Sequence, residues 1–88
     1  MAGFDRETSA KIARLAAAVL ADPRSTATGR ELAGSALAQT RPGNGGVNPA
    51  HTTARLAELA SAVLRDPRST ATEHELAGSV LSQAAPRR

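Results

Sequence analysis

The sequence predicts an all-α fold in which four helices form two tandem helical hairpins, and three observations lead to it. Residues 7–40 and 51–84 are two copies of one repeat, identical at 22 of 34 aligned positions. Within each copy, apolar residues recur every three or four positions, which is the spacing of one face of an α-helix. Each copy is interrupted by the segment DPRS, whose proline ends one helix before the next begins.

The first helix of each copy is expected over about residues 5–21 and 50–65. It ends before Asp22 and Asp66, because a residue that precedes proline is pushed out of the helical region. Its apolar face consists of Ile12, Leu15, Ala16 and Val19, flanked by Thr8 and Leu20, and in the second copy of Leu56, Leu59, Ala60 and Val63, flanked by Thr52 and Leu64.

The second helix of each copy is expected over about residues 26–40 and 70–84. Thr70 and Glu73 have the spacing of a capping box, in which each side chain bonds to the other residue's backbone N–H. In the first copy Thr26 can cap, but Gly29 replaces the glutamate, so a weaker helix start is expected there. The apolar faces are Leu32, Ala33, Ala36 and Leu37, and Leu76, Ala77, Val80 and Leu81.

We expect one domain, residues 1–88, made of hairpin repeats 5–40 and 50–84, a Pro/Gly/Asn linker over 41–49 and a basic tail, 85–88. Only 16 residues are large hydrophobics, against 20 alanines, so neither hairpin is expected to bury its apolar face alone. The prediction is therefore a pseudo-twofold four-helix bundle, as would follow if an ancestral hairpin homodimer had been duplicated and fused. A solenoid-like stack is the alternative, although two repeats are few for one.

Composition narrows the class of protein. The chain has no cysteine, which excludes disulfides and thiolate metal sites, and two of its three net positive charges come from Arg87 and Arg88. Its longest apolar run, residues 15–21, is too short to cross a bilayer, and its first residues do not resemble a secretory signal. We expect a cytoplasmic protein, and the abundance of arginine, alanine and glycine favours a bacterial source.

No chemical site is predicted. His51 and His74 align with Glu7 and Arg30, so neither histidine belongs to the repeated pattern, and no pair of residues has the spacing of a zinc site. No serine or threonine has a neighbouring base and orienting acid, and the segment PGNGGV lacks the spacing of a phosphate-binding loop. We expect no enzyme activity, no cofactor, no metal and no small-molecule ligand.

Two sets of repeated residues are not explained by turns, caps or core. The first is Gly34 and Gly78, since glycine inside a helix costs about 1 kcal/mol relative to alanine. Both lie away from the core leucine, beside small residues such as Ala38 and Ser82. One interpretation is that a neighbouring helix of the same chain approaches closely there; the other is that a partner helix or a second protomer docks there.

The second set is a polar stripe along one edge of the second helix, unchanged between the copies, whereas the surface positions 29, 30 and 38 differ from 73, 74 and 82. Its members are Thr28, Glu31, Ser35 and Gln39, repeated as Thr72, Glu75, Ser79 and Gln83. They either form hydrogen bonds across the hairpin interface, which would fix its register, or present a recognition surface twice. Arg24 and Arg68 in the turns belong to that surface or pair with the nearby Asp22 and Asp66.

These features predict a small structural or interaction module that binds a protein partner or itself. A DNA-associated accessory protein is the alternative, because two helices joined by a tight turn invite comparison with helix-turn-helix proteins. Against it, the second helices carry glutamates and few basic residues, and the basic groups form no stripe.

The turn and second helix of each copy read LADPRST followed by LAGSALAQ, and LRDPRST followed by LAGSVLSQ. This pattern resembles a group of small uncharacterised helical proteins of bacteria, plasmids and phages, over roughly 20 residues per copy. The resemblance implies no activity, substrate or functional residue.

Overall fold

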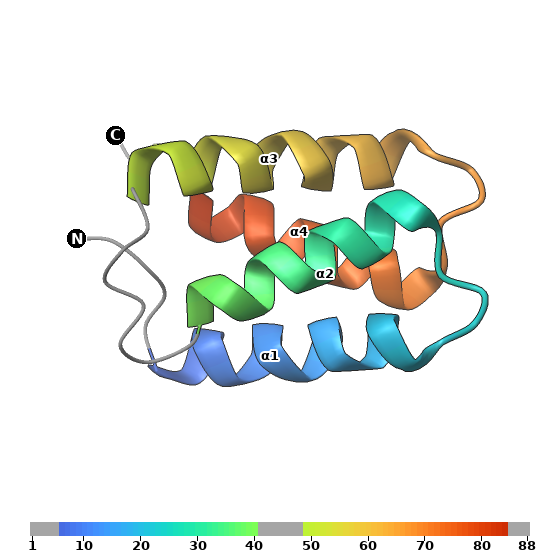
Figure 1. Cartoon of the computed structure of the whole chain (residues 1–88), viewed down its shortest axis with the longest axis horizontal. Helices are drawn as coiled ribbons and strands as arrows, with labels where there is room; N and C mark the ends of the chain where they lie inside the picture. The colour runs from blue at the N-terminus through green and yellow to red at the C-terminus, as the bar shows by residue number, and fades with distance from the viewer. Residues whose placement is uncertain (1–5, 41–48, 85–88) are drawn as a thin grey trace.

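The chain folds as an all-α bundle of four helices in the computed structural model, which describes residues 6–40 and 49–84 (Figure 1). The helices are α1 (Arg6–Ala21), α2 (Ala27–Thr40), α3 (Pro49–Arg65) and α4 (Ala71–Ala84), and the described residues contain no strand. The predicted fold class is confirmed, and each helix bound lies within one residue of its prediction. Most of the predicted linker and the whole of the basic tail lie outside the described residues.

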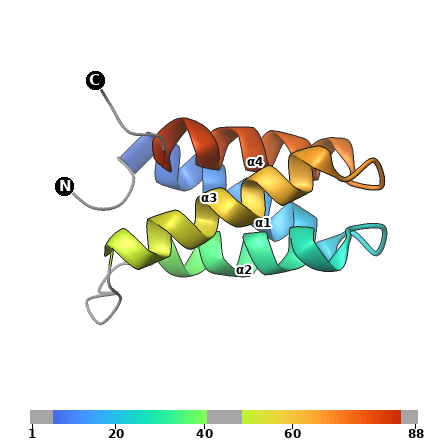
Figure 2. The ribbon, with the colours of Figure 1, turned by 90° about the horizontal axis from the view of Figure 1, so that it is seen from above.

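The four helices are arranged as two hairpins packed against each other. α1 packs on α2 and α3 packs on α4, while α2·α3 and α1·α4 contacts join the hairpins and α2 crosses α4 between them. α1 and α3 lie on opposite sides of the bundle, and both hairpin turns lie at the same end (Figures 1 and 2). The hairpins therefore form the predicted pseudo-twofold pair, which brings the N-termini of α2 and α4 to one end of the bundle.

The core is formed by the inner faces of all four helices, as the apolar pattern predicts. Leu15, Leu37 and Leu81 pack at its edge. Its fully enclosed members include Ile12, Ala16, Val19, Leu32, Ala33, Ala36, Leu56, Ala60, Val63, Leu76, Ala77 and Val80.

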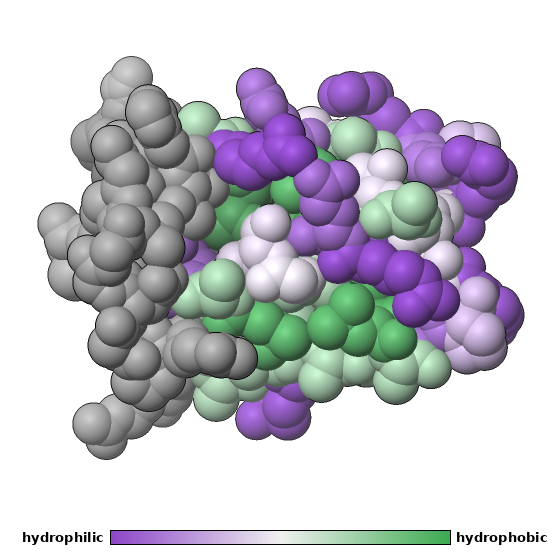
Figure 3. Space-filling model, in the orientation of Figure 1, coloured by the Kyte–Doolittle hydropathy of each residue, from purple (hydrophilic) through white to green (hydrophobic). Residues whose placement is uncertain are grey.

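Leu20 and Leu64, expected to flank the core, instead lie 40% and 43% exposed. Each follows a buried valine, and one residue turns an α-helix by about 100°, which carries these leucines to the solvent side. On the face that carries α2, hydrophobic residues gather along α1, while hydrophilic residues cover much of α2 and α3 (Figure 3).

The repeated segment DPRS builds the same tight turn twice. The Ser25 N–H donates to the Asp22 carbonyl at 3.1 Å, and the Arg24 N–H donates to the Asp22 carboxylate at 2.9 Å, which closes the turn on itself. The Ser25 hydroxyl reaches back to the Val19 carbonyl at 2.7 Å and satisfies one of the acceptors that the end of α1 leaves open. The bonds of Ser69, Arg68, Asp66 and Val63 repeat this arrangement at 3.0, 2.9 and 2.8 Å.

The first turn carries an additional contact from α2. The Arg30 guanidinium donates to the Leu20 carbonyl at 3.2 Å and to the Asp22 carbonyl at 2.9 Å. A cation at the C-terminus of a helix also interacts favourably with the helix dipole. The equivalent position in the second repeat is the exposed His74, so the two turns share their backbone bonds but differ in this support.

The third helix begins at Pro49, which the sequence assigned to the linker. Proline is well suited to the first position of a helix, because its fixed backbone angle is helical and its missing N–H has no intrahelical partner there. None of the helices in the described ranges combines the length and hydropathy needed to cross a membrane.

The turn serines provide a test of this local architecture. We expect Ser25→Ala and Ser69→Ala each to lower the free energy of unfolding by about 1 kcal/mol, because each leaves a helix-end carbonyl without its side-chain donor. Urea unfolding followed by circular dichroism measures the change. Ala27→Ser, at an exposed position beside the first turn, is the control and should leave the stability nearly unchanged.

Candidate functional site

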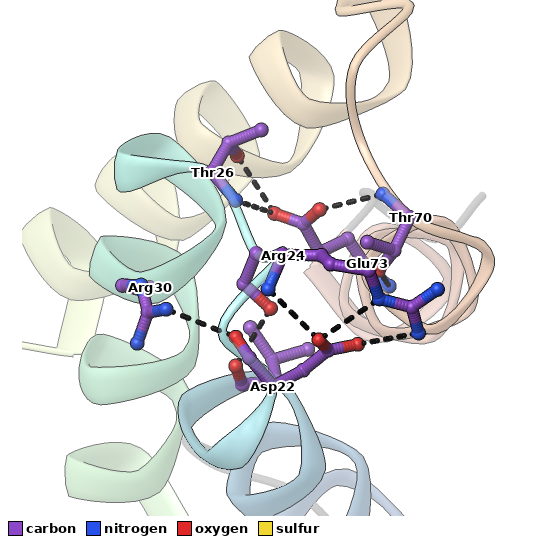
Figure 4. Close-up of polar contacts among 8 residues, drawn as sticks. Asp22, Arg24, Thr26, Arg30, Thr70 and Glu73 are labelled. Carbon is purple, nitrogen blue, oxygen red and sulfur yellow. Dashed lines mark hydrogen bonds and ion pairs between the residues drawn. The ribbon is translucent and has the colours of Figure 1, made fainter.

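A single carboxylate joins the two hairpins at the turn end of the bundle. Glu73, on the first turn of α4, is fully buried. Its Oε1 accepts a hydrogen bond from the Thr70 N–H at 2.6 Å, and its Oε2 accepts from the Thr26 N–H at 2.9 Å and the Thr26 hydroxyl at 2.7 Å (Figure 4). Glu73 therefore completes the cap of its own helix and that of α2 together.

The same carboxylate helps to cap the N-termini of both α2 and α4. Thr26 and Thr70 act as N-caps, since their hydroxyls accept the N–H groups of Gly29 and Glu73 at 3.0 and 3.1 Å. The predicted weaker start of α2 assumed that it lacks a carboxylate, and this is wrong, because the second repeat supplies one. Two helix N-termini converge on the negative charge, and both helix dipoles stabilise it.

Gly29 provides the space that the shared carboxylate occupies. A Cβ atom at position 29 would lie 1.7 Å from Glu73 Oε2, a distance that no pair of non-bonded heavy atoms tolerates. Positions 29 and 73 were expected on the surface, and this too is wrong, since both residues are buried. The helical period already indicates that positions 29 and 73 are buried. Each lies three and four residues before core positions, which for position 29 are Leu32 and Ala33.

The surroundings of Glu73 favour its charged form. Burial raises the pKa of the carboxyl, but the hydrogen bonds from Thr26 and Thr70 outweigh burial, and the pKa lies below its ordinary value of 4.5. A group whose pKa is lower in the folded chain than in the unfolded chain stabilises the fold at high pH. That contribution is lost as the pH falls through the folded pKa.

Replacing Glu73 with glutamine tests the shared cap, because it preserves the side-chain size and removes the charge. We expect Glu73→Gln to lower the free energy of unfolding at pH 7 by about 2 kcal/mol, because hydrogen bonds to a charged acceptor are worth ~1.5–3 kcal/mol. Urea unfolding between pH 3 and 7 should show the gap between the two chains shrinking below pH 4.5, where the wild-type carboxyl becomes protonated. Other carboxylates titrate equally in both chains, so a gap that stays constant over this range would contradict the assignment.

Arg24 and Arg68, which the sequence placed either in a recognition surface or in local ion pairs, form the local pairs. The Arg24 guanidinium donates to both carboxylate oxygens of Asp22 at 3.1 and 3.0 Å, and Arg68 does the same with Asp66 at 3.2 Å. The Arg24 side chain hydrogen-bonds the Asp22 carboxylate and holds the pKa of that group below its ordinary value. Both arginines remain largely exposed while paired.

Gly34 and Gly78 are exposed on the outer faces of α2 and α4, away from the core leucine as predicted. Among the residues that the structure describes, a Cβ at either position would meet nothing within 4 Å, so no described helix approaches closely there. The interpretation of these glycines as close-packing sites within the bundle is therefore wrong. Docking of a partner on this side stays a prediction.

The two polar stripes lie along the contacts between hairpins. Glu31 on α2 forms an ion pair with Arg55 on α3. Thr28, Ser35 and Gln39 are half-buried, and in the second copy Thr72 and Ser79 are half-buried while Glu75 and Gln83 are exposed. Among the described residues, no serine or glutamine of either stripe forms a side-chain hydrogen bond across the hairpin interface, so Glu31 alone ties a stripe to the opposite hairpin.

Three of the four stripe residues of α4 line a groove together with Gly78. This open groove has a volume of about 400 Å³ and is lined by Lys11 on α1 together with Glu75, Gly78, Ser79, Ser82 and Gln83 on α4. It offers a cation, a carboxylate, hydroxyl groups and an amide above a floor that has no side chain at Gly78. Such a surface can make hydrogen bonds and ion pairs with a docked peptide segment.

Comparison of the chain with protein-family models, with curated proteins and with solved structures found no match. The resemblance to small bacterial, plasmid and phage proteins therefore stays a prediction that rests on the LADPRST and LAGS patterns.

The three helical glycines should respond differently to alanine. We expect Gly34→Ala and Gly78→Ala each to raise the free energy of unfolding by ~0.5–1 kcal/mol, because they gain helix propensity without a steric conflict. Gly29→Ala should lower it by ~1–3 kcal/mol, since its methyl group displaces the Glu73 carboxylate. Thermal unfolding of the three variants measures the signs, and equal effects at all three positions would contradict the shared-cap geometry.

Proposed function

We propose that this protein is a non-enzymatic interaction module that binds a protein segment, from a partner or from a second copy of the chain, in the groove between α1 and α4. The observation that carries the proposal is the exposed Gly78 in the groove floor. A glycine at this position costs the helix about 1 kcal/mol, and within the described part of the chain no neighbour requires it. A glycine at this position would allow the backbone of a bound protein segment to approach α4 closely.

The groove has the dimensions and chemistry of a contact for a short peptide segment. Glu75, Ser79 and Gln83 follow one another every four residues, so they line about 12 Å of α4 on one edge. Lys11 faces the groove from α1. A segment lying along α4 would therefore find alternating donors and acceptors beside a strip where its backbone can come close.

The equivalent surface of the first hairpin differs from the groove, and the difference favours the groove as the binding site. There, Glu31 is engaged by Arg55 across the α2·α3 contact. The corresponding pair in the second hairpin is Glu75 with the shorter Lys11, and both line the groove. The polar stripe of α4, beside α1, is therefore more accessible than the stripe of α2, beside α3. We place the binding segment on the α4 stripe.

Four of the described arginines are engaged within the chain, which weighs against the alternative of a DNA-associated protein. Arg24, Arg68 and Arg55 form ion pairs with carboxylates of the same chain, and Arg30 donates to backbone carbonyls. Cations already neutralised within the protein contribute little to phosphate binding. Protein binding is accordingly the favoured function.

A leucine in the groove floor tests the proposal. We expect Gly78→Leu to weaken binding at least ~10-fold with helicity retained, because its side chain occupies the space that a docked backbone requires, and one buried leucine-sized conflict is worth ~1–3 kcal/mol. Sedimentation at several concentrations measures self-association, and capture on the immobilised chain measures partner binding. Ala17→Leu is the matched control, since it adds the same side chain to the exposed face of α1 outside the groove.

The outcomes separate cleanly when circular dichroism is recorded in parallel. Loss of binding by the Gly78 variant alone, with the helix signal unchanged, supports the groove. Equal binding by both leucine variants would refute it, as would a wild-type chain that is monomeric at every concentration and captures no protein.

A further inference from the structure

The contact between the hairpins is asymmetric where the first turns of α2 and α4 meet. Positions 29 and 73 are equivalent in the repeat, yet one holds glycine and the other glutamate. The structure brings them together, because the Glu73 carboxylate lies where a side chain at position 29 would begin. The seven residues that precede these positions, DPRSTAT, are identical in the two copies.

Two copies of the second hairpin, each with glutamate at this position, would not fit together in this arrangement. Each Glu73 side chain would extend toward the Cβ of the other, within the 1.7 Å conflict that Gly29 now avoids. Two carboxylates would also share a space enclosed by protein, where like charges strongly disfavour each other's ionised forms. Such a pairing is opposed both sterically and electrostatically.

Two copies of the first hairpin, each with glycine at this position, would fit together but would leave hydrogen-bond donors without an acceptor. With glycine at both positions, no carboxylate would accept the N–H and hydroxyl hydrogens that Thr26 now donates at 2.9 and 2.7 Å. The same loss would occur on the facing hairpin. Half-buried donors that lose their acceptor destabilise the folded state, so this pairing is weak.

We propose that positions 29 and 73 determine which helical hairpins can pair, so that each hairpin accepts a partner hairpin only where one of the two positions holds glutamate and the other glycine. The preferred partner of either hairpin is then the unlike hairpin, whether it comes from the same chain or from a second copy. The decisive quantity is the number of carboxylates at the junction, and it does not matter which hairpin supplies the one that is needed. This inference concerns the surface between the hairpins and is independent of the groove.

A double-mutant cycle in the full chain tests the proposal. We expect Gly29→Glu and Glu73→Gly each to lower the folding equilibrium constant at pH 7 at least ~10-fold, the first by placing two carboxylates at the junction and the second by leaving none. The double variant Gly29→Glu/Glu73→Gly returns the count to one carboxylate. It should be at least ~10-fold more stable than either single variant, a coupling that independent sites do not show.

A control moves the carboxylate to a helical glycine that is not at the junction. Gly34→Glu/Glu73→Gly has the same composition as the double variant, but its new glutamate lies on the exposed face of α2. We expect this chain to recover at most the ~2–5-fold that replacing an exposed helical glycine gains, well short of the double variant. Urea unfolding followed by circular dichroism gives all five equilibrium constants.

The result that overturns the proposal is additivity. If Gly29→Glu/Glu73→Gly is no more stable than Glu73→Gly, or if the Gly34 control recovers equally well, the position of the carboxylate does not decide pairing. A Gly29→Glu chain as stable as the wild type would overturn it too. If the Gly29→Glu chain is unfolded without denaturant, the measured loss in its folding equilibrium constant is a lower bound. The stability of the double variant relative to Glu73→Gly then decides whether the proposal holds.

Discussion

The bundle depends on one buried carboxylate held between two helix starts. A glutamate without exposure to solvent would destabilise the fold if its oxygens lacked partners, yet Glu73 accepts hydrogen bonds from both threonine caps. Because those caps belong to different hairpins, the bonds that satisfy the charge also fix how the hairpins meet. A core of valine, leucine and alanine is compatible with many registers, whereas the positions of three donors around one carboxylate are compatible with few.

This geometry explains why the segment DPRSTAT is identical in the two repeats. Two hairpins related by a half-turn place their turns and caps in equivalent surroundings, so the residues that build them are the same: aspartate to close the turn, serine to reach back to the preceding helix and threonine to cap the next. Differences accumulate where the surroundings differ. Arg30 supports the first turn and has His74 as its counterpart, while the glycine and glutamate at 29 and 73 occupy a place where equivalent residues meet.

Much of the fold could be predicted from the sequence because its determinants are local. Proline at 23 and 67, the threonine caps and the spacing of apolar residues fixed each helix to within one residue, and the buried faces followed. The shared cap could not be predicted in this way, because a capping box is a pattern within one helix and says nothing of a second helix brought beside it. The outward position of Gly34 and Gly78 also followed from the helical period. Their lack of neighbours required the packing of all four helices to be known.

The pair at 29 and 73 also bears on why two hairpins are joined in one chain. A homodimer of identical hairpins must place the same residue on both sides of its twofold axis, so it can have two glutamates there or none. Two conflict in space and charge, and none leaves the caps without a carboxylate. Fusion of two copies removes this restriction, because each copy can then change independently. A single-chain bundle is therefore able to hold one carboxylate on its symmetry axis, with a glycine opposite, which is a solution that no symmetric pair of these hairpins can reach.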